Sequence, residues 1–146
     1  MSHSNNSDQV ITQEYILAMS EEDYMNDVQL KYFLCLLQEQ RSETSREIDR
    51  VREALSKKES GVQDDADAAT SSLGVDFHTR LLGRLYKFLQ KIDRAIMRIR
   101  DGSYGYCSET GEPIGLARLC LRPTADMPIE QKEHAEAIER QYSDDE

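Results

Sequence analysis

The residues best suited to hold a metal in this sequence lie between Tyr104 and Lys132, in the stretch YGYCSETGEPIGLARLCLRPTADMPIEQK. Cys107 stands where a C-x-x-C pair would begin, but the position of the second cysteine holds Thr110. A structural zinc site takes four ligands, mostly thiolates and imidazoles, and threonine is not a usual one. The stretch therefore has the frame of a small metal-binding finger with too few ligands for the metal.

A different metal site would have to combine Cys107, Cys120 and His134. These supply at most three soft ligands, at a spacing that is unusual for zinc. We therefore expect no zinc and no other metal cofactor, and we interpret Cys107 as a small buried residue.

A second group of reactive side chains is the acidic run Asp64, Asp65 and Asp67. Carboxylates can recruit Mg²⁺ for hydrolysis. Acids at the start of a helix are also favoured by the helix dipole, by about 0.3–1 kcal/mol each, and the spacing alone favours this structural interpretation. No nucleophile–base pair, phosphate-binding loop or histidine cluster is visible, so we do not expect an enzyme.

Two heptad patterns must position these groups. In the first, apolar residues recur at positions 30, 34, 37, 48, 51 and 55, with Arg41 and Thr44 in the middle of the seam. The second runs through positions 82, 85, 89, 92, 96 and 99 and should end at Asp101-Gly102. The stretch between the seams is polar and contains Gly61. The patterns predict an antiparallel coiled-coil hairpin over residues 25–101 with its tip at about residues 60–70, and Asn26-Asp27 should cap its first helix.

Shorter segments complete a mainly α fold. Residues 1–24 should be partly disordered, with a short helix between Ile11 and Met19. Residues 102–125 are rich in turn formers and should form a small lobe, and residues 126–146 should form a C-terminal helix that starts at Asp126 and a frayed tail. The lobe would be held together by packing of apolar side chains against the last helix; the residues are Ile114, Leu116, Leu119 and Leu121, with Ile129, Ala135 and Ile138 as their partners.

Composition excludes several classes of function. The net charge of −10 opposes binding to a nucleic-acid backbone, so we expect no direct DNA binding. No apolar run approaches the ~20 residues of a membrane span, and the N-terminus lacks the pattern of a signal peptide. The odd set of three cysteines is typical of a reducing compartment, and we expect a cytoplasmic protein, monomeric and without a membrane partner.

Three motifs in fixed order resemble those of the DksA/TraR family. They are Asp64-x-x-Asp67-x-Ala69 at the tip, Gly105-Tyr106-Cys107 at the start of the lobe, and Arg122-Pro123-Thr124-Ala125-Asp126 before the last helix. The resemblance runs from about residue 24 to residue 142. It implies a transcription factor that binds RNA polymerase, inserts its coiled-coil tip into the secondary channel and modulates open-complex stability together with ppGpp, as in the stringent response.

The resemblance also assigns roles to particular residues. Asp64, Asp67 and Ala69 would act near the polymerase active site, and Arg84 would contact the polymerase, although a solvated helix face explains Arg84 equally well. The positions that match the ppGpp site of the family are Phe88, Lys91, Arg122 and Lys132. The positions that match its zinc ligands are Cys107, Thr110, Pro128 and Gln131, which lack the full set of cysteines.

Two other functions remain open at this stage. Composition alone is also compatible with a coiled-coil adaptor or structural protein, which needs no particular side chains at the tip. A transcript-cleavage factor of the Gre type would use the tip carboxylates to recruit Mg²⁺.

Overall fold

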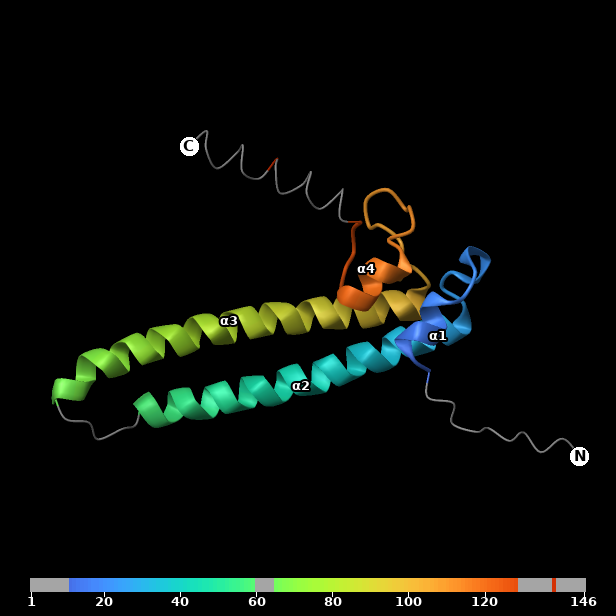
Figure 1. Cartoon of the computed structure of the whole chain (residues 1–146). Helices are drawn as coiled ribbons and strands as arrows, with labels where there is room; N and C mark the ends of the chain where they lie inside the picture. Colours follow the sequence, from blue (N-terminus) through green and yellow to red (C-terminus); the bar gives the residue numbers. More distant parts are fainter. Residues whose placement is uncertain (1–10, 60–64, 129–137, 139–146) are drawn as a thin grey trace, which may run out of the picture.

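The protein is built from a few helices, two of which are very long (Figure 1). The computed structural model describes residues 11–59, 65–128 and 138. Its elements are the short helix α1 (Gln13–Leu17), the 3-10 helix η1 (Glu21–Asp23), the long helices α2 (Asp27–Glu59) and α3 (Asp65–Asp101), and the short helix α4 (Leu116–Leu121). The described residues contain no strand, only one isolated antiparallel bridge between Tyr106 and Pro113.

Helices α2 and α3 run antiparallel and pack along one another (Figure 1), which confirms the predicted hairpin. The cap of α2 is the predicted one, because Asn26 Oδ1 accepts a hydrogen bond from the Gln29 backbone N–H at 2.9 Å. Helix α3 ends at Asp101, as predicted, and Gly102 follows with φ = 86°, a conformation that glycine adopts without strain. Neither helix, nor any other in the described part of the chain, is both long and apolar enough to cross a membrane.

The first heptad seam is confirmed in its centre and modified at Arg41. Leu37, Thr44 and Ile48 are buried, as the spacing predicts. Arg41 is half-exposed instead and lies at the edge of the helix pair, where its Nε is 2.7 Å from Asp93 Oδ1 of α3. A guanidinium can reach from the seam to a carboxylate beside it, which avoids the cost of burying its charge.

The second seam is buried only near the C-terminal end of α3. Ile92 and Ile96 are buried there, and Ala95 between them is buried as well. Leu82, Leu85 and Leu89, farther toward the tip, are only half-buried. The hydrophobic core is therefore concentrated at the end of the hairpin that carries the lobe.

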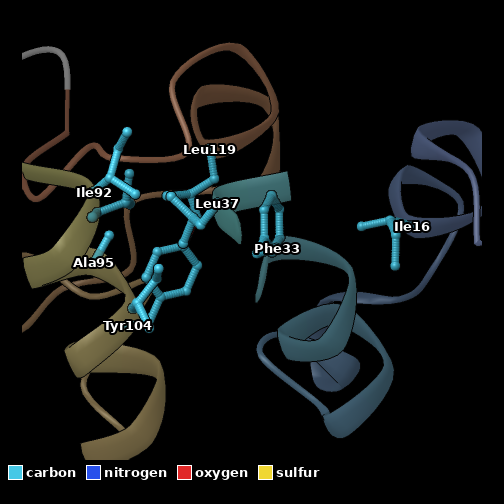
Figure 2. Close-up of a cluster of buried hydrophobic side chains, with 9 residues drawn as sticks. Ile16, Phe33, Leu37, Ile92, Ala95, Tyr104 and Leu119 are labelled. Carbon is cyan, nitrogen blue, oxygen red and sulfur yellow. The ribbon is translucent and has the colours of Figure 1, made fainter. Parts of the chain in front are cut away.

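That core joins side chains from four parts of the chain (Figure 2). Phe33 and Leu37 come from α2, Ile92 and Ala95 from α3, Tyr104 and Leu119 from the lobe, and Ile16 from α1. The heptad pattern does not include Phe33, which is fully buried because the lobe and α1 cover a second stripe of α2. Its ring centroid lies 5.6 Å from that of Tyr104.

One part of the packing predicted for the lobe is wrong, at Leu121 of α4. Ile114 and Leu119 are buried as expected, but Leu121 is 81% exposed. Two residues along a helix correspond to about 200°, so Leu121 points away from the face that buries Leu119. Of the predicted partners, Ile129 and Ala135 lie outside the described residues, and Ile138 is exposed rather than part of the core.

The N-terminal segment fastens the lobe to the hairpin. Tyr24 donates a hydrogen bond from its hydroxyl to the Gly105 carbonyl at 2.5 Å and accepts one from the Gly115 N–H at 2.9 Å. The side chain of Met25 lies so close to Gly105 that a Cβ there would be 2.5 Å from the Met25 sulfur. A Cβ here would require the Met25 side chain to move, and the φ of 88° at this position favours glycine.

Candidate functional site

A groove of about 540 Å³ with several cationic side chains lies between α3 and the lobe. We call it the cationic groove. Its charged lining residues are Lys91, Arg94, Arg98, Arg118, Arg122 and Asp126. In a chain with a net charge of −10, this concentration of positive charge is a local exception. Converging guanidinium and ammonium groups are the side chains that bind phosphates and carboxylates.

The cations come from two short stretches of helix. Lys91, Arg94 and Arg98 follow one another at steps of three and four residues, which places them on one face of α3. Arg118 and Arg122 are four residues apart, at the end of α4. The groove therefore exists only while the lobe is docked on the hairpin.

Two of the five cations hold the lobe itself in place. Arg98 donates from Nη2 to the carbonyl oxygens of Ser103, at 3.0 Å, and Tyr106. Arg118 donates from Nε to the carbonyl of Met127 at 3.1 Å. These bonds fix the turn after α3 and the segment after α4.

The other three cations have no such partner among the described residues. Within the described part of the chain, the side chains of Lys91, Arg94 and Arg122 form no hydrogen bond or ion pair. Three positive side chains that line one groove without internal partners can bind an anion with several charges, such as a polyphosphate.

Tyr104 holds the turn that carries Arg122. Its ring is buried in the core, and its hydroxyl donates a hydrogen bond to the Pro123 carbonyl at 2.6 Å. Burial raises the pKa of Tyr104 well above its ordinary value, so the hydroxyl remains a donor over the physiological range. The position of Arg122 thus depends on a residue of the core.

The turn that begins at Cys107, where the sequence resembles a metal-binding finger, is closed by hydrogen bonds. The Cys107 N–H donates to the Glu112 carbonyl at 2.7 Å, and the Gly111 N–H donates to the Cys107 carbonyl at 2.9 Å. The thiol is buried, which by itself raises its pKa, but hydrogen bonds from the hydroxyl and backbone of Thr110 and from the backbone of Glu109 together lower the pKa. Thr110 therefore occupies the position of a second cysteine, and its hydroxyl and backbone N–H lower the pKa of the Cys107 thiol.

The alternative metal site finds no support within the described residues. Cys120 packs against the hydrophobic core, and burial raises the pKa of its thiol, which disfavours the thiolate form that binds metals. In the part of the chain that the structure describes, no three His, Cys, Asp or Glu side chains converge on a point. His134 lies outside that part.

The structure brings together two of the four residues expected to bind ppGpp. Lys91 and Arg122 both line the cationic groove, although they are far apart in the sequence. Phe88 lies about one turn before Lys91 on α3, is 38% exposed and does not line the groove. Lys132 lies outside the described residues.

The other predicted site residues are placed only in part. Asp64 and Gln131 lie outside the described residues. Asp67 and Ala69 belong to the first two turns of α3, but their side chains are not described. Arg84 is exposed on α3, off the packed seam and beside Phe77 and Arg80. Pro128 is half-buried after the turn of the lobe.

Sequence reasoning missed three cations of the groove, namely Arg94, Arg98 and Arg118. The first two could have been found, because they continue the helical spacing from Lys91. Arg118 gives no such signal, because α4 is six residues long and begins after Gly115 with no capping side chain.

The architecture defines a class of protein, a long helical hairpin with a small lobe docked at its open end, and comparisons with known proteins narrow that class. Residues 29–99 match the family model of the DnaK suppressor protein DksA, N-terminal domain. Residues 102–126 match that of the prokaryotic dksA/traR C4-type zinc finger.

Individual relatives are similar over most of their length. The RNA polymerase-binding transcription factor DksA of Caulobacter vibrioides is 46% identical over 125 residues, which cover 86% of this chain and 88% of the relative. The protein of the same name from Escherichia coli is 33% identical over 84% of this chain and 81% of its own. The solved structure of transcription factor DksA2 from Pseudomonas aeruginosa superposes with a TM-score of 0.80 and 44% identity, covering 88% of this chain and 98% of that one. The chain belongs to the DksA/TraR family, which confirms the resemblance of its motifs.

The zinc that the second family model implies does not fit the residues present. A C4 site takes four thiolates. Between residues 102 and 126 this chain has Cys107 and Cys120, and the second packs against the core. The position of the second cysteine in the turn holds Thr110, whose hydroxyl is not a usual zinc ligand.

Proposed function

We propose that this protein regulates transcription by binding RNA polymerase directly, without binding DNA. The tip of the hairpin enters the secondary channel, where Asp64, Asp67 and Ala69 act near the active site and change the stability of open complexes. The observation that carries the proposal is the match of nearly the whole chain to relatives named RNA polymerase-binding transcription factors, in fold as well as in sequence.

The hairpin supports this role through its dimensions. Helix α3 has 37 residues, which corresponds to about 55 Å at 1.5 Å per residue. A rod of this length carries its tip far from the lobe. Arg84, exposed partway along the rod, is proposed to contact the polymerase outside the channel.

The cationic groove supports ppGpp as the effector. Lys91 and Arg122 line the same groove from two elements, and Arg94 lines it as well. Lys132 and Phe88 complete the proposed site by resemblance. The net charge of the chain is negative, so these cations provide local attraction for an anion with several phosphates.

The lobe is proposed to work without zinc. The turn from Cys107 to Gly111 is closed by backbone hydrogen bonds, and the lobe is fixed to the hairpin by Tyr24, Arg98 and Tyr104. These bonds and the apolar core supply the constraint that a metal supplies in a C4 finger.

The test of the tip is an in vitro transcription assay on a ribosomal RNA promoter with purified polymerase, with zinc chelated throughout. The double variant Asp64→Asn/Asp67→Asn should still bind polymerase but lose the effect on open-complex lifetime. An unchanged effect would favour an adaptor whose tip carries no chemistry. Short 3′ fragments released from stalled complexes would favour transcript cleavage instead.

The test of the effector site uses two substitutions in the groove and one outside it. Lys91→Ala and Arg122→Ala should each weaken the response to ppGpp by about 10-fold or more, because a hydrogen bond to a charged group contributes about 1.5–3 kcal/mol. Arg100→Ala is the matched control, since Arg100 is exposed on α3 and does not line the groove. If all three variants weaken the response to ppGpp equally, the response depends on the net charge of the protein and not on the groove.

A further inference from the structure

A second hollow, of about 590 Å³, lies on another side of the lobe, between the N-terminal segment and the loop that leads into α4. We call it the apolar hollow. It is lined by Leu17, Met19, Ser20, Glu21, Tyr24, Pro113, Gly115 and Leu116. It shares no residue with the cationic groove. Its volume is within the ~300–1,000 Å³ typical of binding pockets, and most of its side chains are apolar.

The side chains of the hollow divide into a packed floor and an exposed rim. Met19, Tyr24 and Leu116 pack against the hydrophobic core, so the floor is fixed. Leu17 at the rim is 44% exposed, and Pro113, which also lines the hollow, is exposed as well. An apolar rim around an apolar floor leaves surface whose burial by a partner is favourable.

The charged residue that lines the hollow and its neighbours in η1 and before Pro113 are acidic. Glu21 lines it, Glu22 and Asp23 continue the 3-10 helix η1, and Glu112 precedes Pro113 on the other side. None of these carboxylates forms an ion pair within the described residues. A partner that inserts an apolar side chain here would therefore be favoured if it also carries Lys or Arg.

We propose that the apolar hollow receives an apolar side chain from a basic segment of RNA polymerase, as a contact separate from those of the tip and the cationic groove. The inference rests on the proposed function, because it takes polymerase as the partner. The hollow forms where the docked lobe meets the N-terminal segment, since α1 contacts α4 and both lie at the open end of the hairpin (Figure 1). A contact at this end would hold the rod while its tip is in the channel.

The first experiment compares two substitutions in α1. Leu17→Asp places a charge at the rim of the hollow, whereas Tyr15→Asp places the same charge at a residue that is 54% exposed and does not line it. Affinity for purified cognate RNA polymerase should fall about 10-fold for Leu17→Asp, as at an interface anchor, and remain unchanged for Tyr15→Asp. Both variants should unfold at the same temperature as the wild type.

The second experiment tests the acidic rim. The double variant Glu21→Lys/Glu22→Lys should also bind polymerase more weakly, and its affinity should depend less on salt than that of the wild type. A photoreactive p-benzoylphenylalanine in place of Leu17 should crosslink to a polymerase peptide that contains Lys or Arg, whereas the same group in place of Tyr15 should crosslink much less.

Several outcomes would overturn the inference. If the wild type binds polymerase and Leu17→Asp binds equally well, the hollow is not a contact, but the proposed function stands. If the wild type does not bind polymerase, both the inference and the proposed function are wrong. Crosslinks from position 17 to residues 1–10 or 129–146 of the same chain, or to a second copy, would show a different occupant of the hollow.

Discussion

The two ends of the helical hairpin are made of the same two helices but differ in how their side chains are buried. At the lobe end, Phe33, Leu37 and Ile92 are completely buried. Toward the tip, Leu73 is 69% exposed and Phe77 is 53% exposed. Phe33 lies outside the heptad seam, and Leu73 and Phe77 precede the seam of α3, so the seam alone does not explain the difference. The lobe and α1 form an additional layer over the helices at one end, whereas the described residues toward the tip have only the opposite helix.

Because of this difference, the two ends of the hairpin are suited to different tasks. Residues that are proposed to converge on a ligand, such as Lys91 and Arg122, lie where the core and the tyrosine hydrogen bonds fix the backbone. Residues that are proposed to act at a distance lie on a helix pair with fewer buried contacts, where local opening costs less free energy. Large exposed side chains such as Phe77 are available to a partner there rather than to the core.

The largest expected effect compares one phenylalanine at each end. Phe33→Ala should lower the free energy of unfolding by about 3–5 kcal/mol, because it leaves a cavity among Leu37, Tyr104 and the other core residues. Phe77→Ala makes the same chemical change at an exposed position and should change stability by no more than about 0.5 kcal/mol. Urea unfolding followed by circular dichroism measures both. Similar losses for the two variants would mean that the ends are equally packed.

The fold could be predicted from the sequence where periodicity is local. Heptad spacing locates α2 and α3, and the residues at their ends, Asn26 and Gly102, mark where helices start and stop. The burial of Phe33 could not be predicted in this way, because it depends on the lobe, which is distant in sequence. Helix α4 was missed for a related reason, since a helix of six residues is stabilised by tertiary packing of Leu119 rather than by its own sequence.

The candidate site could likewise be predicted from the sequence only in part. The resemblance predicted Lys91 and Arg122 as ppGpp-binding residues, and the structure shows only that both line one groove. Arg94 and Arg98 follow from helical spacing once Lys91 is known. The roles of Tyr24 and Tyr104 could not be predicted, because each bonds to a backbone carbonyl that only the folded lobe brings within reach.

Alkaline pH provides the next largest effect, and it acts on the lobe end. Burial raises the pKa of both Tyr24 and Tyr104 above the ordinary value of about 10. Above that pH the unfolded chain loses the protons of the two phenol groups, while the native state keeps them. The free energy of unfolding therefore has its full value below pH 10 and falls as the pH rises. For Tyr104 the loss approaches about 1.4 kcal/mol per pH unit.

The measurement is urea unfolding between pH 8 and 11.5 of the wild type and of Tyr104→Phe. The variant should be less stable at neutral pH by about 1 kcal/mol, since the Pro123 carbonyl loses its donor. It should also show a shallower fall in stability above pH 10. An identical slope in the two proteins would show that Tyr104 is not the residue whose titration destabilises the fold.

Removal of the Cys107 thiol should have a smaller effect. Cys107→Ala should lower the free energy of unfolding by about 1–2 kcal/mol, as for the truncation of a small buried side chain. In a zinc finger the loss of one ligand, or of the metal, typically unfolds the domain. EDTA should therefore leave the melting temperature of the wild type unchanged, and a stoichiometric zinc content with a large EDTA shift would contradict the metal-free lobe.

The smallest expected effect lies between the two ends, at the ion pair of Arg41 and Asp93. Both side chains are about half-exposed, at 50% and 49%, so water and salt screen their 2.7 Å contact. A double-mutant cycle with Arg41→Ala, Asp93→Ala and the combined variant should give a coupling of about 0.2–1 kcal/mol, which decreases in 1 M NaCl. A coupling above about 2 kcal/mol would mean that this pair extends the rigid end of the hairpin toward the tip. A weak coupling would show that the pair adds little rigidity beyond the apolar core cluster, whose members nearest the tip are Leu37 and Ile92.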